Sequence, residues 1–212
     1  MQLILVDIYD EVCKAFETYF ADLPNVTVFH GKFQDVETYD CMVSPANSFG
    51  IMDGGIDAAI TQFFGEQLMQ RVQRRLRDEW GCEQPVGTSI IVKTMHPEHP
   101  YLAHTPTMRV PMTIVKTDIV YNAMWAMLHA VNNFNKTAEK PIETILCPGL
   151  GTATGGMPPE EAARQMALAY KNFLNPPSVI EWDAMLRRQR EIRFGGYYGF
   201  TQEKMDGDKF DD

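Results

Sequence analysis

Two segments of the sequence combine glycine with small polar residues in a way that could hold an anion. The first, residues 43–57, reads VSPANSFGIMDGGID, and the second, residues 148–158, reads PGLGTATGGMP. Glycine lets backbone N–H groups approach an anion without a Cβ in the way, and the N-terminus of a following helix adds a favourable potential. The threonine hydroxyls of the second segment add further donors. These segments therefore predict a phosphate, diphosphate or ribose as the ligand.

Neither segment matches the two best-known phosphate-binding patterns. No Lys follows the glycines of the second segment, so it is not a P-loop, and it lacks the G-x-G-x-x-G spacing of dinucleotide-binding proteins. The sequence therefore argues against a kinase and against a dehydrogenase. A single glycine pair before a helix is most often a plain turn, but two such segments in one chain favour a binding site.

The spacing of apolar residues predicts the elements that position these segments. Apolar and β-branched runs predict strands at residues 3–8, 26–29, 41–43, 87–92 and 144–147, with one or two more between 101 and 115. Helical spacing predicts helices at residues 10–20, 118–134, 158–174 and 178–193, and one or two helices between 55 and 80. This order indicates an α/β fold with a mixed, mostly parallel sheet between helices, in which ligands bind beyond the carboxyl ends of the strands.

Composition limits the class of protein. The 212 residues fit one domain, expected at residues 1–177, followed by a C-terminal helix and a Gly/aromatic/acidic tail at residues 178–212. The net charge of −9 argues against general binding to nucleic acid or to anionic lipid. No apolar run approaches the roughly 18 residues of a membrane span, and no cationic leader is present, so we expect a cytoplasmic protein. The four cysteines are scattered without a C-x-x-C pair, which predicts neither a zinc site nor a disulfide framework.

The two segments resemble those of the macrodomain family, whose members bind ADP-ribose and have a mixed sheet between helices. The family's Asn-Ala-Ala-Asn, Gly-rich turn and Val-Asp pair are similar to residues 44–47, Ser-Pro-Ala-Asn, and residues 53–57, Asp-Gly-Gly-Ile-Asp. Its Ile-Ser-Thr-Gly-x-Tyr/Phe-Gly-x-Pro loop is similar to residues 150–158. The resemblance covers about residues 25–175.

The resemblance implies a set of ligand contacts, and we expect no cofactor or metal. Asn47 would bind the distal ribose, Gly54 and Gly55 would lie along that ribose and its phosphate, and residues 151–156 would wrap the diphosphate. The full expected set is Ser44, Ala46, Asn47, Asp53, Gly54, Gly55, Ile56, Gly149, Gly151, Thr152, Ala153, Thr154, Gly155, Gly156 and Met157, with Phe33 and Asp35 near the base.

The resemblance also implies a pair of candidate catalytic residues, Asn47 and Asp57. Some hydrolytic members use an acid at the position of Asp57 to orient a water. A carboxylate could hold or deprotonate a water that attacks the distal ribose, while the amide of Asn47 fixes the hydroxyls. Asp57 could equally be a first-turn acid that stabilises its helix.

Three positions depart from the family pattern. Lys32 stands where the family has the Asp that takes the adenine amino group, so Asp35 could reach the same place, Phe33 could stack on the base, or adenine is not the preferred base. Ser44 replaces the first Asn of the family motif, and Gly155 replaces an aromatic residue that stacks on ribose unless Phe49 or Met157 takes its place. Base selectivity and catalysis therefore stay open.

Other polar clusters have simpler explanations. His96 and His99 could share a metal, but a solvated loop is favoured because no Cys or Asp nearby completes a ligand set. His104 could face the pocket as a donor or acid, or be satisfied by the backbone. The arginines at 71–77 alternate with acids, which favours a solvated helix face over a nucleic-acid patch. The aromatic residues 194–200 could cover the pocket or contact a partner.

Three functions therefore remain from the sequence. The chain could bind ADP-ribose, or a related NAD-derived nucleotide diphosphate, and hydrolyse ADP-ribosyl bonds at the distal ribose, including those of an ADP-ribose phosphate. It could be a non-catalytic sensor of free or conjugated ADP-ribose or of a related signalling nucleotide. It could be an assembly protein with a degenerate pocket, and a homo-oligomer through the C-terminal extension is one form of such an assembly.

Overall fold

The computed structural model describes residues 1–192, which form one six-stranded sheet between two layers of helices. The strand order is β2-β1-β6-β3-β5-β4, and only β4 runs antiparallel to its neighbour. The strands are β1 Gln2–Asp7, β2 Val26–His30, β3 Cys41–Ser44, β4 Ile90–Lys93, β5 Tyr101–His104 and β6 Thr144–Pro148. The predicted α/β fold with a mostly parallel sheet is therefore confirmed.

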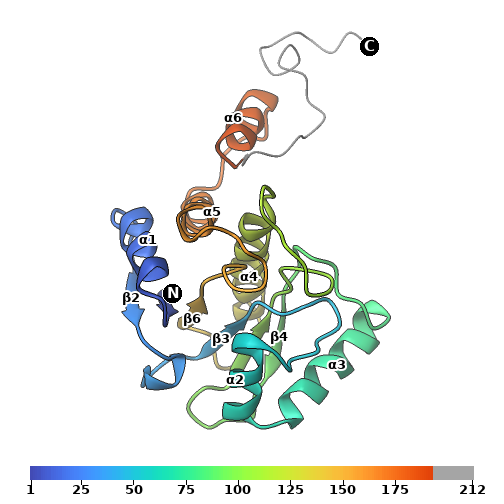
Figure 1. The fold of residues 1–212 in the computed structure, drawn as a ribbon. Coiled ribbons are helices and arrows are strands. Elements are labelled where there is room, and N and C mark those ends of the chain that lie inside the picture. Colours follow the sequence, from blue (N-terminus) through green and yellow to red (C-terminus); the bar gives the residue numbers. More distant parts are fainter. Residues whose placement is uncertain (193–212) are drawn as a thin grey trace.

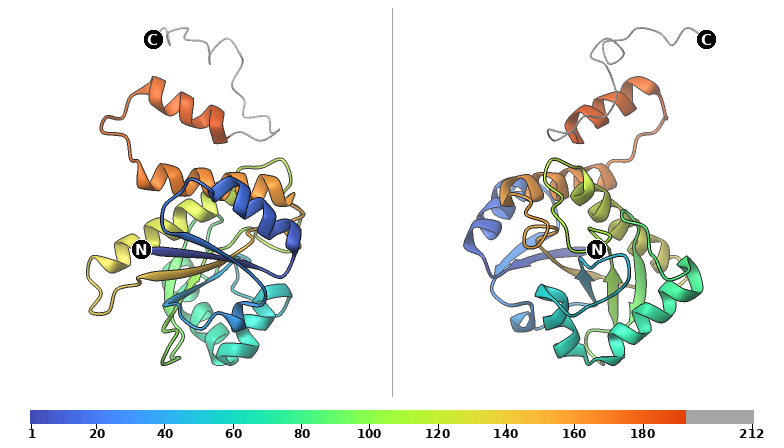
Figure 2. Two further views of the ribbon diagram at one scale, coloured as in Figure 1. Left: turned by 90° about the vertical axis from the view of Figure 1, so that its left-hand side faces the viewer. Right: turned by 45° about the vertical axis from the view of Figure 1, so that its right-hand side comes forward.

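The helices divide between the two faces of the sheet (Figures 1 and 2). One face is covered by α1 Asp10–Phe20, α4 Ile119–Asn135 and α5 Pro159–Leu174, and the other by α2 Gly55–Phe64 and α3 Gln67–Trp80. Side chains alternate along a strand, so Leu3 and Leu5 of β1 pack under the first layer while Val6 packs under the second. A hydrophobic core therefore lies on each face of the sheet, and together the two cores hold the strands and their ends in place.

The structure resolves the two regions that the sequence left ambiguous. Residues 55–80 form two helices because Gly65, at φ +89°, ends α2 in a conformation that few other residues adopt. Between residues 101 and 115 only β5 is a strand. The segment that follows β5 contains Pro106 and Pro111, which lack the N–H that a sheet ladder needs, and it crosses to the second glycine segment through a bond from Ile114 N–H to the Gly155 carbonyl.

A last helix, α6 Trp182–Ile192, lies beyond α5 and contacts α4 through Arg188, while Arg164 of α5 donates to the Glu191 and Ile192 carbonyls at its end. The guanidinium of Arg188 lies 4.3 Å from the ring centre of Trp125 and donates to the hydroxyl of Tyr121. Val179 and Ile180, which precede the helix, are exposed. The predicted aromatic contact at residues 194–200 lies outside the described residues.

The arginine-rich face of α3 is tied to the edge of the sheet. Arg75 pairs with Glu79 on the same helix and also donates to the Ile91 carbonyl of β4. Arg71 donates to the Thr94 carbonyl. These side chains therefore have structural partners within the domain. Among residues 1–192, none of the helices is both long and apolar enough to cross a membrane.

Candidate functional site

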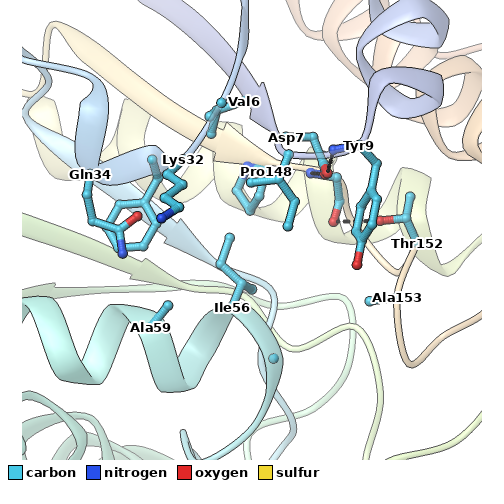
Figure 3. Close-up of a pocket in the computed structure, with 15 residues that line it drawn as sticks. Val6, Asp7, Tyr9, Lys32, Gln34, Ile56, Ala59, Pro148, Thr152 and Ala153 are labelled. Carbon is cyan, nitrogen blue, oxygen red and sulfur yellow. Dashed lines mark hydrogen bonds between the residues drawn. The ribbon is translucent and has the colours of Figure 1, made fainter.

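Both glycine segments reach one cleft of about 390 Å³ at the carboxyl ends of the parallel strands (Figure 3). The cleft lies where the chain order of the strands switches, since β1 pairs with β2 on one side and with the distant β6 on the other. Open α/β sheets bind ligands at such a point. The cleft is lined by Val6, Asp7, Ile8, Tyr9, Gly31, Lys32, Phe33, Gln34, Gly55, Ile56, Ala59, Pro148, Gly149, Thr152 and Ala153.

The first segment forms one wall of the cleft with the first turn of α2. Gly54 is the N-cap in an extended conformation, and Gly55 has φ +53°, which L side chains rarely adopt. A Cβ added to either glycine would meet no atom within 4 Å. The open space above this helix N-terminus and the two small residues suit an anion bound against the backbone.

The second segment forms the opposite wall, but its glycines serve two purposes. Gly149 lies in the cleft, and its N–H donates to the Asp7 carboxylate at 3.3 Å. A Cβ on Gly151 would lie 2.5 Å from the side chain of Ile114, and one on Gly155 would lie 2.5 Å from the Gly151 carbonyl. These last two glycines are therefore required by close packing, whether or not a ligand is bound.

Met157, one of two residues that could have taken the place of the missing ribose-stacking ring, does not do so. Its side chain is 1% exposed and belongs to the core under α4 and α5. The bond from its N–H to the Gly151 carbonyl closes the loop and turns the side chain inward. Phe49 is partly buried but does not line the cleft either.

Asp7, the last residue of β1, and Tyr9, the N-cap of α1, line the cleft and are not among the site residues predicted from the sequence. The Asp7 carboxylate accepts the N–H of Tyr9 at 3.1 Å and that of Gly149, and burial raises its pKa. The only signal in the sequence was the predicted strand at residues 3–8, which contains Asp7. That β1 lies beside β6, and hence beside the second glycine segment, depends on the strand order.

Lys32, Phe33 and Gln34 form the end of the cleft that follows β2 (Figure 3). The Phe33 ring is 4% exposed and meets Phe63 edge to face. Asp35, which could have replaced the missing acid of the family pattern, is exposed and does not line the cleft. This end is therefore apolar with a lysine and an amide at its rim.

Asn47 uses its side chain to close its own loop. Its Oδ1 accepts the N–H groups of Phe49 and Ile51 at 3.0 and 3.3 Å, and its Nδ2 donates to the Ile51 carbonyl at 2.7 Å. Asn47 does not line the cleft. In this arrangement the Asn47 side chain stabilises the conformation of the loop at residues 47–51.

Asp57 and Ser44 form a buried pair beside the cleft. Ser44 is fully buried at the end of β3, and its hydroxyl donates to Asp57 in the first turn of α2 at 2.6 Å. Burial raises the pKa of Asp57 to about 6, although the Ser44 bond acts in the opposite direction. Asp57 is 9% exposed and does not line the cleft.

His104 is not a donor or acid of the cleft. It is fully buried beside Ser44 in the strand register, and burial lowers its pKa to about 3, so the ring is neutral. Its Nδ1 lies 2.7 Å from Oε1 of Gln84, whose amide nitrogen donates to the His104 carbonyl and to Thr88. Since the amide oxygen is the acceptor, Nδ1 carries the proton and Nε2 does not.

The histidines at 96 and 99 stack rather than converge on a shared ion. Glu98 lies near both rings, but these rings are nearly parallel, with 12° between their planes and 4.9 Å between centres. A metal binds in the plane of an imidazole ring along the nitrogen lone pair, so one ion cannot lie in both planes. In addition, Nδ1 of His96 accepts two backbone N–H groups. The pair is better described as part of an aromatic stack with Tyr39.

The structure thus divides the expected ligand-binding and catalytic residues into two sets. Those that line the cleft are Phe33, Gly55, Ile56, Gly149, Thr152 and Ala153. Those that do not are Asp35, Ser44, Ala46, Asn47, Asp53, Gly54, Asp57, Gly151, Thr154, Gly155, Gly156 and Met157.

Comparison with known proteins agrees with this architecture. A family model described as Macro domain matches residues 43–166. An uncharacterized protein of Aquifex aeolicus (strain VF5) is 28% identical over 157 residues, which cover 74% of this chain and 86% of that protein. A macro domain-containing protein of Caldanaerobacter subterraneus subsp. tengcongensis is 24% identical over 183 residues, which cover 85% of this chain and 97% of that protein. Among solved structures, a mutant of the Oceanobacillus iheyensis macrodomain with ADPR has a TM-score of 0.58 at 21% identity, covering 84% of this chain and 80% of that chain.

Proposed function

The chain belongs to the Macro domain family, and we propose that it binds ADP-ribose or a related NAD-derived nucleotide diphosphate in the cleft between its two glycine segments. The observation that carries the proposal is the convergence of Gly55 and Gly149, which are far apart in sequence, on one cleft. The Oceanobacillus iheyensis neighbour with ADPR supports the choice of ligand.

The walls of the cleft match the parts of such a ligand. Val6, Phe33, Ile56 and Pro148 offer apolar surface for a base or sugar. The N-terminus of α2 offers unpaired N–H groups and a positive potential for a diphosphate. Pockets of several hundred Å³ that combine apolar walls with a few polar groups are typical small-molecule sites.

Two neighbouring alanines of α2 provide the test. Ala58 and Ala59 are both partly buried, but only Ala59 lines the cleft. Ala59→Glu places a bulky carboxylate in the lining of the cleft, so we expect it to weaken ADP-ribose binding at least about tenfold, a loss of about 1.4 kcal/mol. Ala58→Glu adds the same charge one residue away and is expected to change affinity less than threefold.

Isothermal titration calorimetry with ADP-ribose measures both variants against the parent chain. Absence of any heat with ADP-ribose, ADP or a UDP-sugar would contradict the binding function and leave the assembly role. An equal loss in both variants would show that charge on α2, and not the cleft, accounts for the effect.

Hydrolysis at the distal ribose is a second candidate function, favoured by the environment of Asp57. A carboxyl whose pKa is raised to about 6 can accept a proton from water near neutral pH more readily than an ordinary aspartate. In this step a water oxygen bonds to C1 of the distal ribose, the bond to the leaving group breaks with its electron pair, and Asp57 takes the water proton. Asn47 would act through the loop that it closes, which leads to Gly55 and Ile56 in the wall of the cleft.

Asp57→Asn and Asp57→Ala test this function with an ADP-ribosylated protein as substrate. We expect both variants to bind ADP-ribose and neither to release it from the modified protein. Release at the parent rate would remove Asp57 from the mechanism. No release by the parent chain, with binding intact, would favour the sensor function.

A further inference from the structure

The end of the cleft after β2 has one charged group, the ammonium of Lys32. Among residues 1–192 the structure shows no ion pair and no hydrogen bond of this ammonium. Lys32 lies in the cleft lining next to Gln34, in a protein whose net charge is −9. A lysine without a protein partner at the rim of an apolar cleft is available to a ligand.

Acidic groups are scarce at this end of the cleft. Asp35 is exposed and outside the lining, and the carboxylate of Asp7 lies near Tyr9 and Thr152, at the other end in the view of Figure 3. Each oxygen of Asp7 also accepts a backbone N–H. No carboxylate of the described residues is therefore placed beside Lys32 to accept an amino group of a base.

The apolar surfaces beside Lys32 favour a flat heterocycle over a second phosphate. Phe33, Ile56 and Ala59 line this region. A phosphate in contact with these side chains would lose bound water and gain no hydrogen bonds in return. A planar base can rest on such surfaces and present its polar edge to the rim. Adenine presents an amino donor at C6, whereas a 6-oxopurine presents a carbonyl acceptor there beside N7.

We propose that this cleft prefers a nucleotide with a 6-oxopurine base, hypoxanthine or guanine, over one with adenine, and that Lys32 determines the preference. The inference rests on the proposed nucleotide-binding function and goes beyond it in the base, since ADP-ribose carries adenine and would bind less tightly than its hypoxanthine counterpart. The Lys32 ammonium donates to O6 or N7 of a 6-oxopurine. In adenine the group at C6 is an amino donor, which cannot accept a hydrogen bond from the ammonium. Gln34 adds a carbonyl oxygen that can accept the N1–H, which hypoxanthine carries and adenine lacks.

Inosine diphosphate and adenosine diphosphate are the sharpest pair of probes. They share the ribose and both phosphates and differ only at C6 and the N1 proton. By titration calorimetry we expect the parent chain to bind inosine diphosphate at least about fivefold more tightly, the lower end of the discrimination typical of a specific base contact. Lys32→Met should remove most of the difference, and Lys32→Asp should reverse it.

Lys93→Asp is the matched control for charge. Lys93 is exposed and pairs with Tyr101 at the amino end of β5, on the opposite edge of the sheet from the cleft. This variant should leave the ratio of the two affinities unchanged, even if a long-range charge effect lowers both.

The outcomes separate the inference from the function on which it rests. Equal or tighter binding of adenosine diphosphate by the parent chain, or a ratio that Lys32→Met leaves unchanged, would overturn the base preference while leaving nucleotide binding intact. Binding of neither diphosphate would overturn the proposed function itself. A ratio that responds to Lys32→Met and Lys32→Asp but not to Lys93→Asp would support the inference.

Discussion

The hydroxyl of Ser44 donates a hydrogen bond of 2.6 Å to the carboxylate of Asp57 and so joins the carboxyl end of β3 to the first turn of α2. Both side chains are buried. Burial disfavours the charged carboxylate more than the hydroxyl stabilises it, so the pKa of Asp57 rises to about 6. A carboxyl beside the proposed binding cleft thus changes its charge close to neutral pH.

The raised pKa of Asp57 predicts a pH dependence of stability. From about pH 4 to pH 6 the folded state holds a proton on Asp57 that the unfolded state has lost, so the free energy of unfolding falls as pH rises. The stabilisation is complete below the unfolded pKa and is lost above about pH 6, and it amounts to roughly 3 kcal/mol.

Urea denaturation of the parent chain and of Asp57→Asn at several pH values measures this effect. We expect the difference between the two chains to change by that amount between pH 4 and pH 7.5, with Asp57→Asn gaining in relative stability as pH rises. A difference that is constant with pH would show that Asp57 titrates normally.

Removal of the Ser44 hydroxyl should raise the pKa of Asp57 further, because that hydroxyl stabilises the charged form. In Ser44→Ala we expect a midpoint above pH 6 in a ¹³C NMR titration of the Asp57 carboxyl. Stability should fall by about 1–3 kcal/mol at pH 8, where the buried charge has lost its donor, and by less at pH 5.

Ser89→Ala is the control for this substitution. The hydroxyls of Ser89 and Thr105 lie 2.8 Å apart, and among the described residues the side-chain hydrogen-bond partner of Asp57 is Ser44 and not Ser89. Its effect on stability should not depend on pH over this range. A midpoint for Asp57 that is the same in Ser44→Ala and in the parent chain would refute the assigned role of the bond.

The side chain of Asn47 should matter for loop structure before it matters for binding. Asn47→Ala removes three hydrogen bonds to residues 49 and 51 and should cost about 1–3 kcal/mol of stability. We expect weaker ADP-ribose binding as well, because the loop leads into the wall formed by Gly55 and Ile56. Asn47→Asp keeps the acceptor oxygen and should show a smaller loss of stability.

Denaturation and calorimetry on the same two variants distinguish the possible causes. Loss of affinity in proportion to the loss of stability indicates an effect through the loop. Loss of affinity by Asn47→Ala at unchanged stability would indicate a direct contact with the ligand instead.

The two adjacent glycines of the first segment should respond oppositely to the same substitution. Gly54 has the extended backbone of an N-cap, so Gly54→Ser can place its hydroxyl over the first N–H groups of α2 and stabilise the chain by a few tenths of a kcal/mol. Gly55 has φ +53°, so Gly55→Ser should destabilise it by about 1–2 kcal/mol. Thermal denaturation measures both, and equal effects would contradict the assigned backbone conformations.

Much of the fold could be predicted from local pattern. The helix at residues 10–20 has the predicted bounds, and the strand before each glycine segment ends within a residue of its predicted end. Such elements depend on the spacing of apolar residues and on turn residues, which are local properties. The site was predicted less completely. Asp7 and Tyr9 line the cleft although the sequence did not predict them, and Met157 was predicted to bind the ligand but is buried in the core.

The sequence by itself determined the alternation of strands and helices, the two glycine segments and their position at strand ends, because each follows from short-range periodicity and backbone preference. The tertiary structure decided which strand ends are neighbours. The order β2-β1-β6-β3 places Lys32 and Asp7 in one cleft with Gly149, and the bond from the Met157 N–H to the Gly151 carbonyl closes the second segment with Met157 in the core. These relations depend on how helices cover the two faces of the sheet, which no local pattern in the chain specifies.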